Sequence, residues 1–208
     1  MKFYESGDNR KPVIFLFPGT CCLYSSFDHV LDGLHSYFYT VTVSYDGFDP
    51  NEKTEFYSME DECEKIEQEI RKKYGGRIKA AYGCSLGGSF VSFLIQRKRI
   101  HIDHGIIGSS DMDEAGRLMA KIQSSMVVPF MYKMIHTGAL PKFMQKKLNK
   151  TDEGKKELYN GFLNMFGIGK GGSPWITKQS IYNQFYSDLV TKVQHGIDVP
   201  GTTIHVFY

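Results

Sequence analysis

The chain has 208 residues, of which 41% are hydrophobic and 23% are charged, and its formal net charge is +2. This balance is typical of one medium globular domain, or of one domain with a large insertion, and it excludes disordered and fibrous chains. The sequence contains no run of 18 apolar residues, so it predicts no membrane span, and its first residues lack the apolar core of a secretion signal. Its four cysteines lack metal-ligand spacing, so we expect free thiols in a reducing cytoplasm.

The first half of the chain alternates predicted strands with predicted helices. Apolar or β-branched runs predict buried strands, and apolar residues at helical spacing between them predict helices. The strands are expected at 13–17, 41–45, 79–83 and 104–108, and the helices are expected to begin near 27, 58 and 86. This rhythm predicts a parallel sheet with helices on both faces, whose ligands bind beyond the carboxyl ends of the strands.

The helix that begins near residue 58 has clear signals at both ends. Ser58 precedes Asp61 by three residues, which is typical of a helix start, and Gly75-Gly76 is typical of a helix end. Acidic residues crowd its first turns, and we expect them to form a solvated face.

The most informative segment is Gly83-Cys84-Ser85-Leu86-Gly87-Gly88, which lies between a predicted strand and a predicted helix. A serine at a tight strand-to-helix turn, with glycines two residues before and after it, is typical of a nucleophile elbow. The glycines are needed because the strand and the helix pass close to each other there. The pattern predicts that Ser85 exposes its hydroxyl as a nucleophile and that Cys84 packs as a small residue. The alternative is a glycine-rich turn without chemistry.

The alternation stops in the second half of the chain, where the pattern is mostly helical until a last strand is predicted at 202–208. The methionines and phenylalanines of this helical segment admit two interpretations, an acyl-binding groove or an ordinary helical core. We therefore expect three segments: a core over 1–112, a helical cap over 113–194, and a return to the core over 195–208.

Two further stretches do not indicate a partner. The glycine-rich stretch 167–172 lacks the spacing of a phosphate loop, so it predicts no nucleotide site. The basic run at 142–150 is too brief to indicate nucleic-acid binding.

Together these features resemble the α/β-hydrolase family. Phe17-Pro18-Gly19-Thr20 is similar to the loop after the family's third strand, where a His-Gly or Pro-Gly pair precedes an oxyanion-hole residue. Residues 83–88 resemble the nucleophile elbow, the helical segment resembles the cap that many members insert after the sixth strand, and 202–208 is similar to the seventh strand. The resemblance covers nearly the whole chain. It implies a mostly parallel sheet flanked by helices, with a helical cap insertion.

Carried over to this sequence, the resemblance implies that Ser85 is the nucleophile. The backbone N–H groups of Leu86 and Thr20 would form the oxyanion hole, with Cys21 as the second choice for Thr20. Asp111 matches an acid position that some members use after the sixth strand, and the alternative is that it caps a helix. The implied substrate is a carboxylic ester or thioester, cleaved through an acyl-enzyme with neither a metal nor an organic cofactor.

The sequence departs from the family at the catalytic histidine. The family commonly places the acid after the seventh strand and the histidine after the eighth, whereas this sequence ends at Tyr208. None of its histidines occupies the expected place, although His136 could approach from the cap, and we expect His205 to pack against a helix. The seven are His29, His35, His101, His104, His136, His195 and His205.

We therefore expect a chain truncated after the seventh strand, with its catalytic histidine beyond the end. A missing C-terminal segment, or self-association, would cover the open strand edge. The alternative is a catalytically inactive binding protein with the α/β-hydrolase fold.

Overall fold

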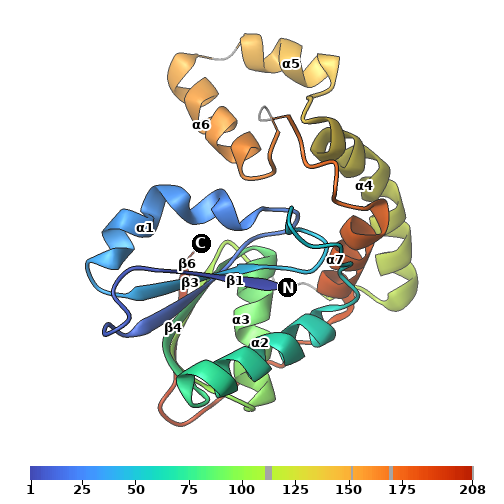
Figure 1. Cartoon of the computed structure of the whole chain (residues 1–208). Coiled ribbons are helices and arrows are strands. Elements are labelled where there is room, and N and C mark those ends of the chain that lie inside the picture. Colours follow the sequence, from blue (N-terminus) through green and yellow to red (C-terminus); the bar gives the residue numbers. More distant parts are fainter. Residues whose placement is uncertain (111–113, 151, 169–170, 208) are drawn as a thin grey trace.

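The computed structural model describes residues 1–110, 114–150, 152–168 and 171–207 (Figure 1). These residues contain a six-stranded sheet with the order β1-β3-β2-β4-β5-β6, in which β1 is antiparallel to β3 and the other pairs are parallel. The mostly parallel sheet predicted from the sequence is therefore confirmed. The strands are β1 (Lys2–Ser6), β2 (Val13–Phe17), β3 (Tyr39–Ser44), β4 (Arg77–Cys84), β5 (His101–Gly108) and β6 (Thr203–Phe207).

The edge strand β1 is the strand that the sequence did not predict. It pairs with β3 from Lys2 opposite Ser44 to Ser6 opposite Thr40. Its five residues are only partly buried and include no apolar run. An edge strand of this kind is defined by its partner, so its own sequence carries little signal.

Helices cover both faces of the sheet (Figure 1). Alternate side chains of β2 enter two separate cores, because successive residues of a strand point to opposite faces. Ile14 and Leu16 belong to one cluster, whereas Phe15 and Phe17 belong to the larger one. The helices are α1 (Asp28–His35), preceded by a 3-10 turn (Tyr24–Phe27), on one face, and α2 (Met59–Tyr74) and α3 (Leu86–Arg97) on the other.

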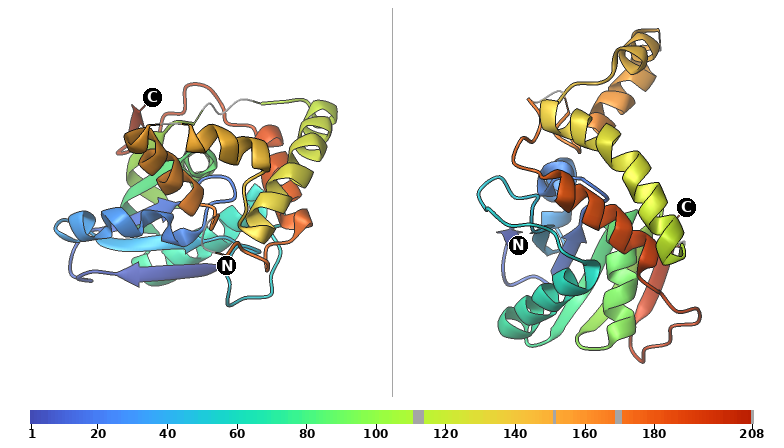
Figure 2. Two further views of the ribbon diagram at one scale, coloured as in Figure 1. Left: turned by 90° about the horizontal axis from the view of Figure 1, so that it is seen from above. Right: turned by 90° about the vertical axis from the view of Figure 1, so that its right-hand side faces the viewer.

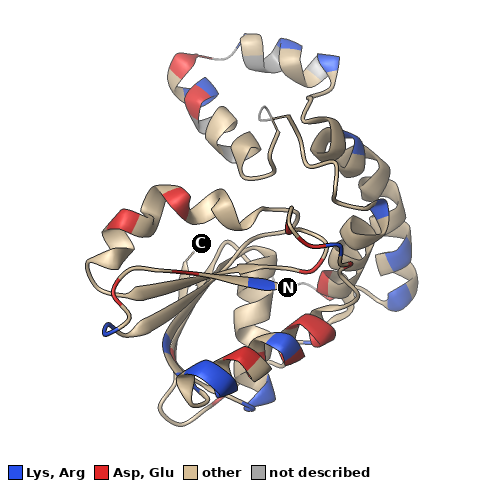
Figure 3. Cartoon of the chain, in the orientation of Figure 1, with Lys and Arg blue, Asp and Glu red and all other residues tan. Residues whose placement is uncertain are grey.

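Both predicted ends of α2 are confirmed. The Ser58 hydroxyl oxygen accepts a hydrogen bond from the Asp61 N–H at 3.1 Å, and Gly75 ends the helix with a left-handed φ of 62°. Acidic residues lie in the first turn of α2 and basic residues in its last turn (Figure 3). This distribution complements the helix dipole.

The acidic start of α2 is solvated as expected at Glu60, Asp61 and Glu64, but not at Glu62. Glu62 is fully buried, where its carboxylate accepts a hydrogen bond from the Asp46 N–H at 3.0 Å and pairs with Lys65 at 2.9 Å. Burial, with the charge of Asp46 nearby, raises the pKa of Glu62 to about 7. At Glu62 the expectation is wrong because tertiary packing places β3 and the loop after it over this side chain.

A buried ion pair joins α3 to α2. The Arg97 side chain is 8% exposed and its Nε donates to the fully buried carboxylate of Glu67 at 2.6 Å. Its other nitrogens reach Glu60 at 3.3 Å and Glu64 at 3.4 Å. The two helices on this face are therefore fixed to each other by charge as well as by apolar packing.

We expect Arg97→Met to lower the free energy of unfolding by about 3 kcal/mol, because it leaves the Glu67 carboxylate buried with only the more distant Arg99. Urea denaturation followed by circular dichroism measures this loss. The double variant Arg97→Met/Glu67→Leu should recover most of it, because no charge is then left buried. An equal loss in both variants would show that the ion pair is not what the single variant disturbs.

The described residues between β5 and β6 form four helices and no strand. In the two views of Figure 2, α4 and α7 lie side by side next to the sheet, whereas α5 and α6 stand farther from it. No helix in the described ranges is both long and apolar enough to cross a bilayer. The four are α4 (Arg117–Thr137), α5 (Lys142–Asn149), α6 (Glu153–Asn164) and α7 (Lys178–Val190).

The strand predicted at 202–208 is present as β6, which forms the second edge of the sheet. Within the described residues it pairs only with β5, and its apolar side chains are exposed, Phe207 at 60%. His205 does not pack against a helix as expected: it is exposed and its Nε2 lies 3.3 Å from Nδ1 of His104. The expectation is wrong because no described helix covers this part of the sheet.

Candidate active site

Ser85 lies at the turn that joins β4 directly to α3. Its φ of 54° and ψ of −125° lie outside the regions that residues with a Cβ ordinarily adopt. Such a conformation costs on the order of 1–3 kcal/mol and persists only when the surroundings enforce it. The Ser85 N–H is held by the Gly108 carbonyl at 2.9 Å, and the residue is exposed. The predicted strained turn between strand and helix is present.

The glycines around Ser85 make this turn possible. A Cβ on Gly83 would lie 2.0 Å from the backbone of Gly87, and a Cβ on Gly87 would lie 2.1 Å from the Phe17 carbonyl oxygen. Both distances are far inside van der Waals contact, and the opposing atoms are backbone, which cannot rotate away. The absence of side chains at these positions lets β4, α3 and the end of β2 meet.

The loop after β2 lies against the Ser85 turn. A Cβ on Gly19 would be 3.7 Å from the Cβ of Ser85 and 3.2 Å from the Cys84 carbonyl oxygen. The backbone N–H groups of Thr20 and Leu86 form no hydrogen bond with any described residue. Two N–H donors are thus free on the two segments that flank Ser85, and an oxyanion hole needs such a pair.

Cys21, the second choice for the oxyanion hole, is already engaged. Its N–H donates to Oε1 of Gln184 at 2.6 Å, and both residues are fully buried. Thr20 is therefore the residue of this loop whose N–H remains available. Gln184 itself was not identified from the sequence, because it lies 163 residues away from Cys21 and no local pattern marks it.

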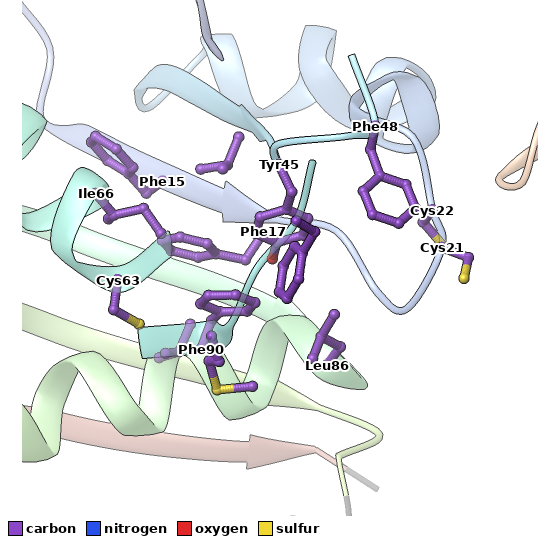
Figure 4. Close-up of a cluster of buried hydrophobic side chains, with 14 of the residues drawn as sticks. Phe15, Phe17, Cys21, Cys22, Tyr45, Phe48, Cys63, Ile66, Leu86 and Phe90 are labelled. Carbon is purple, nitrogen blue, oxygen red and sulfur yellow. The ribbon is translucent and has the colours of Figure 1, made fainter. Parts of the chain in front are cut away.

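Aromatic side chains form the base under this loop (Figure 4). The Tyr45 ring stacks on Phe90 with centroids 4.7 Å apart, and the Phe17 ring is nearly parallel to Phe90 at 6.3 Å. The Tyr45 hydroxyl donates to the Pro18 carbonyl at 3.2 Å. The first turns of α3 and the loop after β2 are therefore held by one rigid aromatic cluster.

The thiols next to Ser85 are not activated. Burial, and the neighbouring Cys84, raise the pKa of Cys22 to about 12, and burial raises the pKa of Cys84 above its ordinary value. A thiol nucleophile reacts as the thiolate, which these groups do not form near neutral pH. All four cysteines of the chain are free.

The structure does not bring a histidine to Ser85. Within the described residues no hydrogen bond joins the Ser85 hydroxyl to any of the seven histidines. His35 bonds instead to Ser6 at 2.9 Å. His136 lies at the end of α4, where its ring contacts Tyr132 and its Nδ1 is buried without a described partner. Asp111, the predicted acid, lies outside the described residues.

A cavity of about 590 Å³ lies between the end of α4, the first turn of α5 and the end of α6. Its lining combines apolar side chains with three carboxamides, Gln145, Asn160 and Asn164. The segment after α6 also contacts the loop after β2, because the Leu23 N–H donates to the Met165 carbonyl at 2.9 Å. The helical segment therefore contacts the loop that also carries Thr20.

Comparison with known proteins identifies the fold that carries this turn. No protein-family model and no curated protein matches the sequence, but solved structures do. An α/β-hydrolase family protein from Desulfitobacterium hafniense has a TM-score of 0.70 at 14% identity, over 91% of this chain and 72% of that chain. The chain has the α/β-hydrolase fold.

Two esterases share this α/β-hydrolase fold with the chain. A thermophilic esterase from Thermogutta terrifontis has a TM-score of 0.70, and a carboxylesterase structure from Nitrososphaera gargenis has 0.69, each at 14% identity. In both cases the match covers 99% of this chain and 74% of the other. In this α/β-hydrolase fold, Ser85 lies at the strand-to-helix turn where the sequence resemblance places a nucleophile.

Proposed function

We propose that this protein is a serine hydrolase that cleaves a carboxylic ester or thioester through an acyl-enzyme on Ser85. The observation that carries the proposal is the exposed, strained Ser85 between glycines that admit no side chain. Strain of this kind gathers at functional sites, because a simple connection between strand and helix does not need it. The esterases that share the fold are consistent with this activity.

The oxyanion hole is proposed to consist of the free N–H groups of Leu86 and Thr20. Leu86 is the first residue of α3, so its N–H also lies at the positive end of the helix dipole. Fixed donors at this place stabilise the negative charge that develops on the substrate carbonyl oxygen, and losing one typically costs about 2.7–4 kcal/mol of barrier.

The acid and the base are the parts of the proposal that depend on more than the described residues. Asp111 remains the proposed acid, since it follows the carboxyl end of β5 by three residues. A serine hydroxyl needs a neighbouring base, and Ser85 has no histidine as a hydrogen-bond partner in the described structure. We propose that the base is a histidine outside residues 1–208, supplied by a segment that also covers the open edge of β6.

The helical segment is proposed to act as a cap that holds the acyl group. Its contact with the loop after β2, and the cavity among its helices, support this role.

The free cysteines are consistent with a cytoplasmic location, which we propose on that ground. The substrate is proposed to be a small-molecule acyl ester or thioester.

The acyl-enzyme is tested with p-nitrophenyl acetate and p-nitrophenyl octanoate. We expect an initial burst of p-nitrophenol that is stoichiometric with the protein, followed by slower turnover, because the covalent intermediate forms before it is hydrolysed. Intact mass after rapid acid quenching should show one acyl group added. Hydrolysis without a burst or an added acyl group would contradict the covalent mechanism.

One observation favours the second candidate, a catalytically inactive binding protein: Ser85 has no histidine partner among the described residues. Such a protein would bind an ester without consuming it. Isothermal titration with a stable ether analogue of the ester, alongside the hydrolysis measurement, separates the two functions. Binding without any product supports the binding protein.

A further inference from the structure

The helix α7 buries a polar stripe beside the fully buried Ile181. Ser180, Gln184 and Ser187 lie on one side at helical spacing, and all three are buried. Burying polar side chains is unfavourable unless each finds a hydrogen-bond partner. The hydrogen-bond partners of these side chains therefore indicate the role of the stripe.

Two members of the stripe, Ser180 and Gln184, accept hydrogen bonds from backbone groups of two loops. The Ser180 hydroxyl accepts from the Phe56 N–H at 3.2 Å, and the Asn183 amide donates to the Phe56 carbonyl at 2.7 Å. One turn further along, the Gln184 Oε1 accepts from the Cys21 N–H at 2.6 Å. Through these contacts α7 holds the loop after β3 and, separately, the loop after β2.

Gln184 is the member of the stripe whose presence a contribution to stability alone does not explain. Its oxygen is committed to Cys21, and its Nε2 is buried with no hydrogen-bond partner among the described residues. Leaving such donors unpaired costs about 1–3 kcal/mol. Methionine would fill a similar volume without that cost, but it would not hold the Cys21 N–H.

The bond from Gln184 fixes one particular state of a tight turn. The Cys22 N–H donates to the Gly19 carbonyl at 3.0 Å, so Thr20 and Cys21 are the central residues of the turn. Cys21 has a left-handed φ of 59°, which type II turns require at this position and which non-glycine residues disfavour. Without an acceptor for its N–H, the peptide between Thr20 and Cys21 is free to flip to the unstrained alternative.

We infer that Gln184 is a positioning residue that fixes the oxyanion loop, keeping the Cys21 N–H out of the oxyanion hole and leaving the Thr20 N–H as its donor. This inference rests on the proposed function, in which Thr20 contributes to that hole. The helical segment then influences the reaction at Ser85 through the hydrogen bond from the Cys21 N–H to Gln184, in addition to any contact that it makes with the substrate.

The test compares Gln184→Met with Ser180→Ala. Each removes one buried hydrogen bond from α7 to a loop backbone, but only the first concerns the oxyanion loop. Two quantities are measured on the full chain: hydrogen exchange of the peptide that contains residues 18–24, by mass spectrometry, and the rate constant for labelling of Ser85 by a fluorophosphonate. With p-nitrophenyl acetate, kcat and KM are measured separately.

For Gln184→Met we expect faster exchange in residues 18–24 and a loss of at least about tenfold in labelling rate and kcat, with KM nearly unchanged. Ser180→Ala should leave exchange in that peptide and the labelling rate within about threefold of wild type. Unchanged exchange in folded Gln184→Met would overturn the inference, and so would faster exchange with unchanged labelling.

Two further results keep the test decisive. If Gln184→Met does not fold, Gln184→Glu, which keeps the acceptor oxygen, should retain the protection of residues 18–24 and most of the labelling, and a folded Glu variant that loses both overturns the inference. A wild-type protein that is never labelled, even with the segment that supplies the histidine present, refutes the proposed function instead, and the exchange measurement then decides by itself whether Gln184 holds the loop.

Discussion

Gly87→Ala is expected to lower the free energy of unfolding by about 3 kcal/mol or more, near the upper end for overpacking a protein interior. The new Cβ would lie 2.1 Å from the Phe17 carbonyl oxygen and 3.1 Å from that of Pro18. Both are backbone atoms, so α3 and the end of β2 must separate to admit the methyl group. Thermal unfolding followed by circular dichroism measures the loss.

Gly33→Ala provides the matched control for this substitution. Gly33 lies on exposed α1, and a Cβ there would meet nothing within 4 Å. Alanine favours a helix over glycine by up to about 1 kcal/mol, so this variant should be as stable as wild type or slightly more stable. A Gly87→Ala protein as stable as Gly33→Ala would show that β2 and α3 are not packed as described.

Replacing Ser85 with glycine is expected to abolish hydrolysis and at the same time to raise the free energy of unfolding. Ser85→Gly removes the nucleophile and also relieves the left-handed φ of 54°, so it should raise the free energy of unfolding by about 1 kcal/mol. Ser85→Ala removes the hydroxyl but keeps the strain, so its stability should stay near that of wild type. Both variants should lose hydrolysis by about 10⁴-fold or more if the wild type forms an acyl-enzyme.

Parallel urea denaturation and ester hydrolysis of the three proteins check this expectation. Comparing glycine with alanine separates the backbone strain from the loss of the hydroxyl, because only glycine adopts this φ freely. Equal stability of the two variants would contradict the strain. Hydrolysis that survives in both would contradict the role of Ser85.

Much of the fold could be predicted from the sequence, because the sheet is parallel and buried. The central strand Val13–Phe17 is a continuous apolar run, and the turn at Ser85 carries the glycines that its geometry requires. Local signals also defined α2, whose cap at Ser58 and left-handed end at Gly75 are both present. In each case the residues that decide the structure are neighbours in the chain.

The features that the sequence did not reveal depend on contacts between distant segments. The strand β1 exists through its pairing with β3, and Glu62 is buried because the chain after β3 packs over it. Gln184 meets Cys21 only because α7 returns to the sheet edge, 163 residues later in the chain. Local pattern reasoning has no access to such encounters.

Within the candidate site, the sequence predicted the turn at Ser85 and its contact with the loop after β2. It left Thr20 and Cys21 as alternatives, and the hydrogen bond from Cys21 to Gln184 now favours Thr20. The prediction for Asp111 stays a prediction, since that residue lies outside the described ranges. No local signal could supply the base, because the partner of a serine is defined by the fold.

The most direct test of the central claim is labelling of the 208-residue chain and of Ser85→Ala with a fluorophosphonate, followed by intact mass. Our account predicts little labelling of the 208-residue chain by itself, because its base is proposed to lie outside these residues. It predicts one adduct once a segment that supplies the histidine is present, and none on Ser85→Ala. An adduct that persists in Ser85→Ala, or its complete absence from the wild type even with that segment present, would contradict the assignment of Ser85 as the nucleophile.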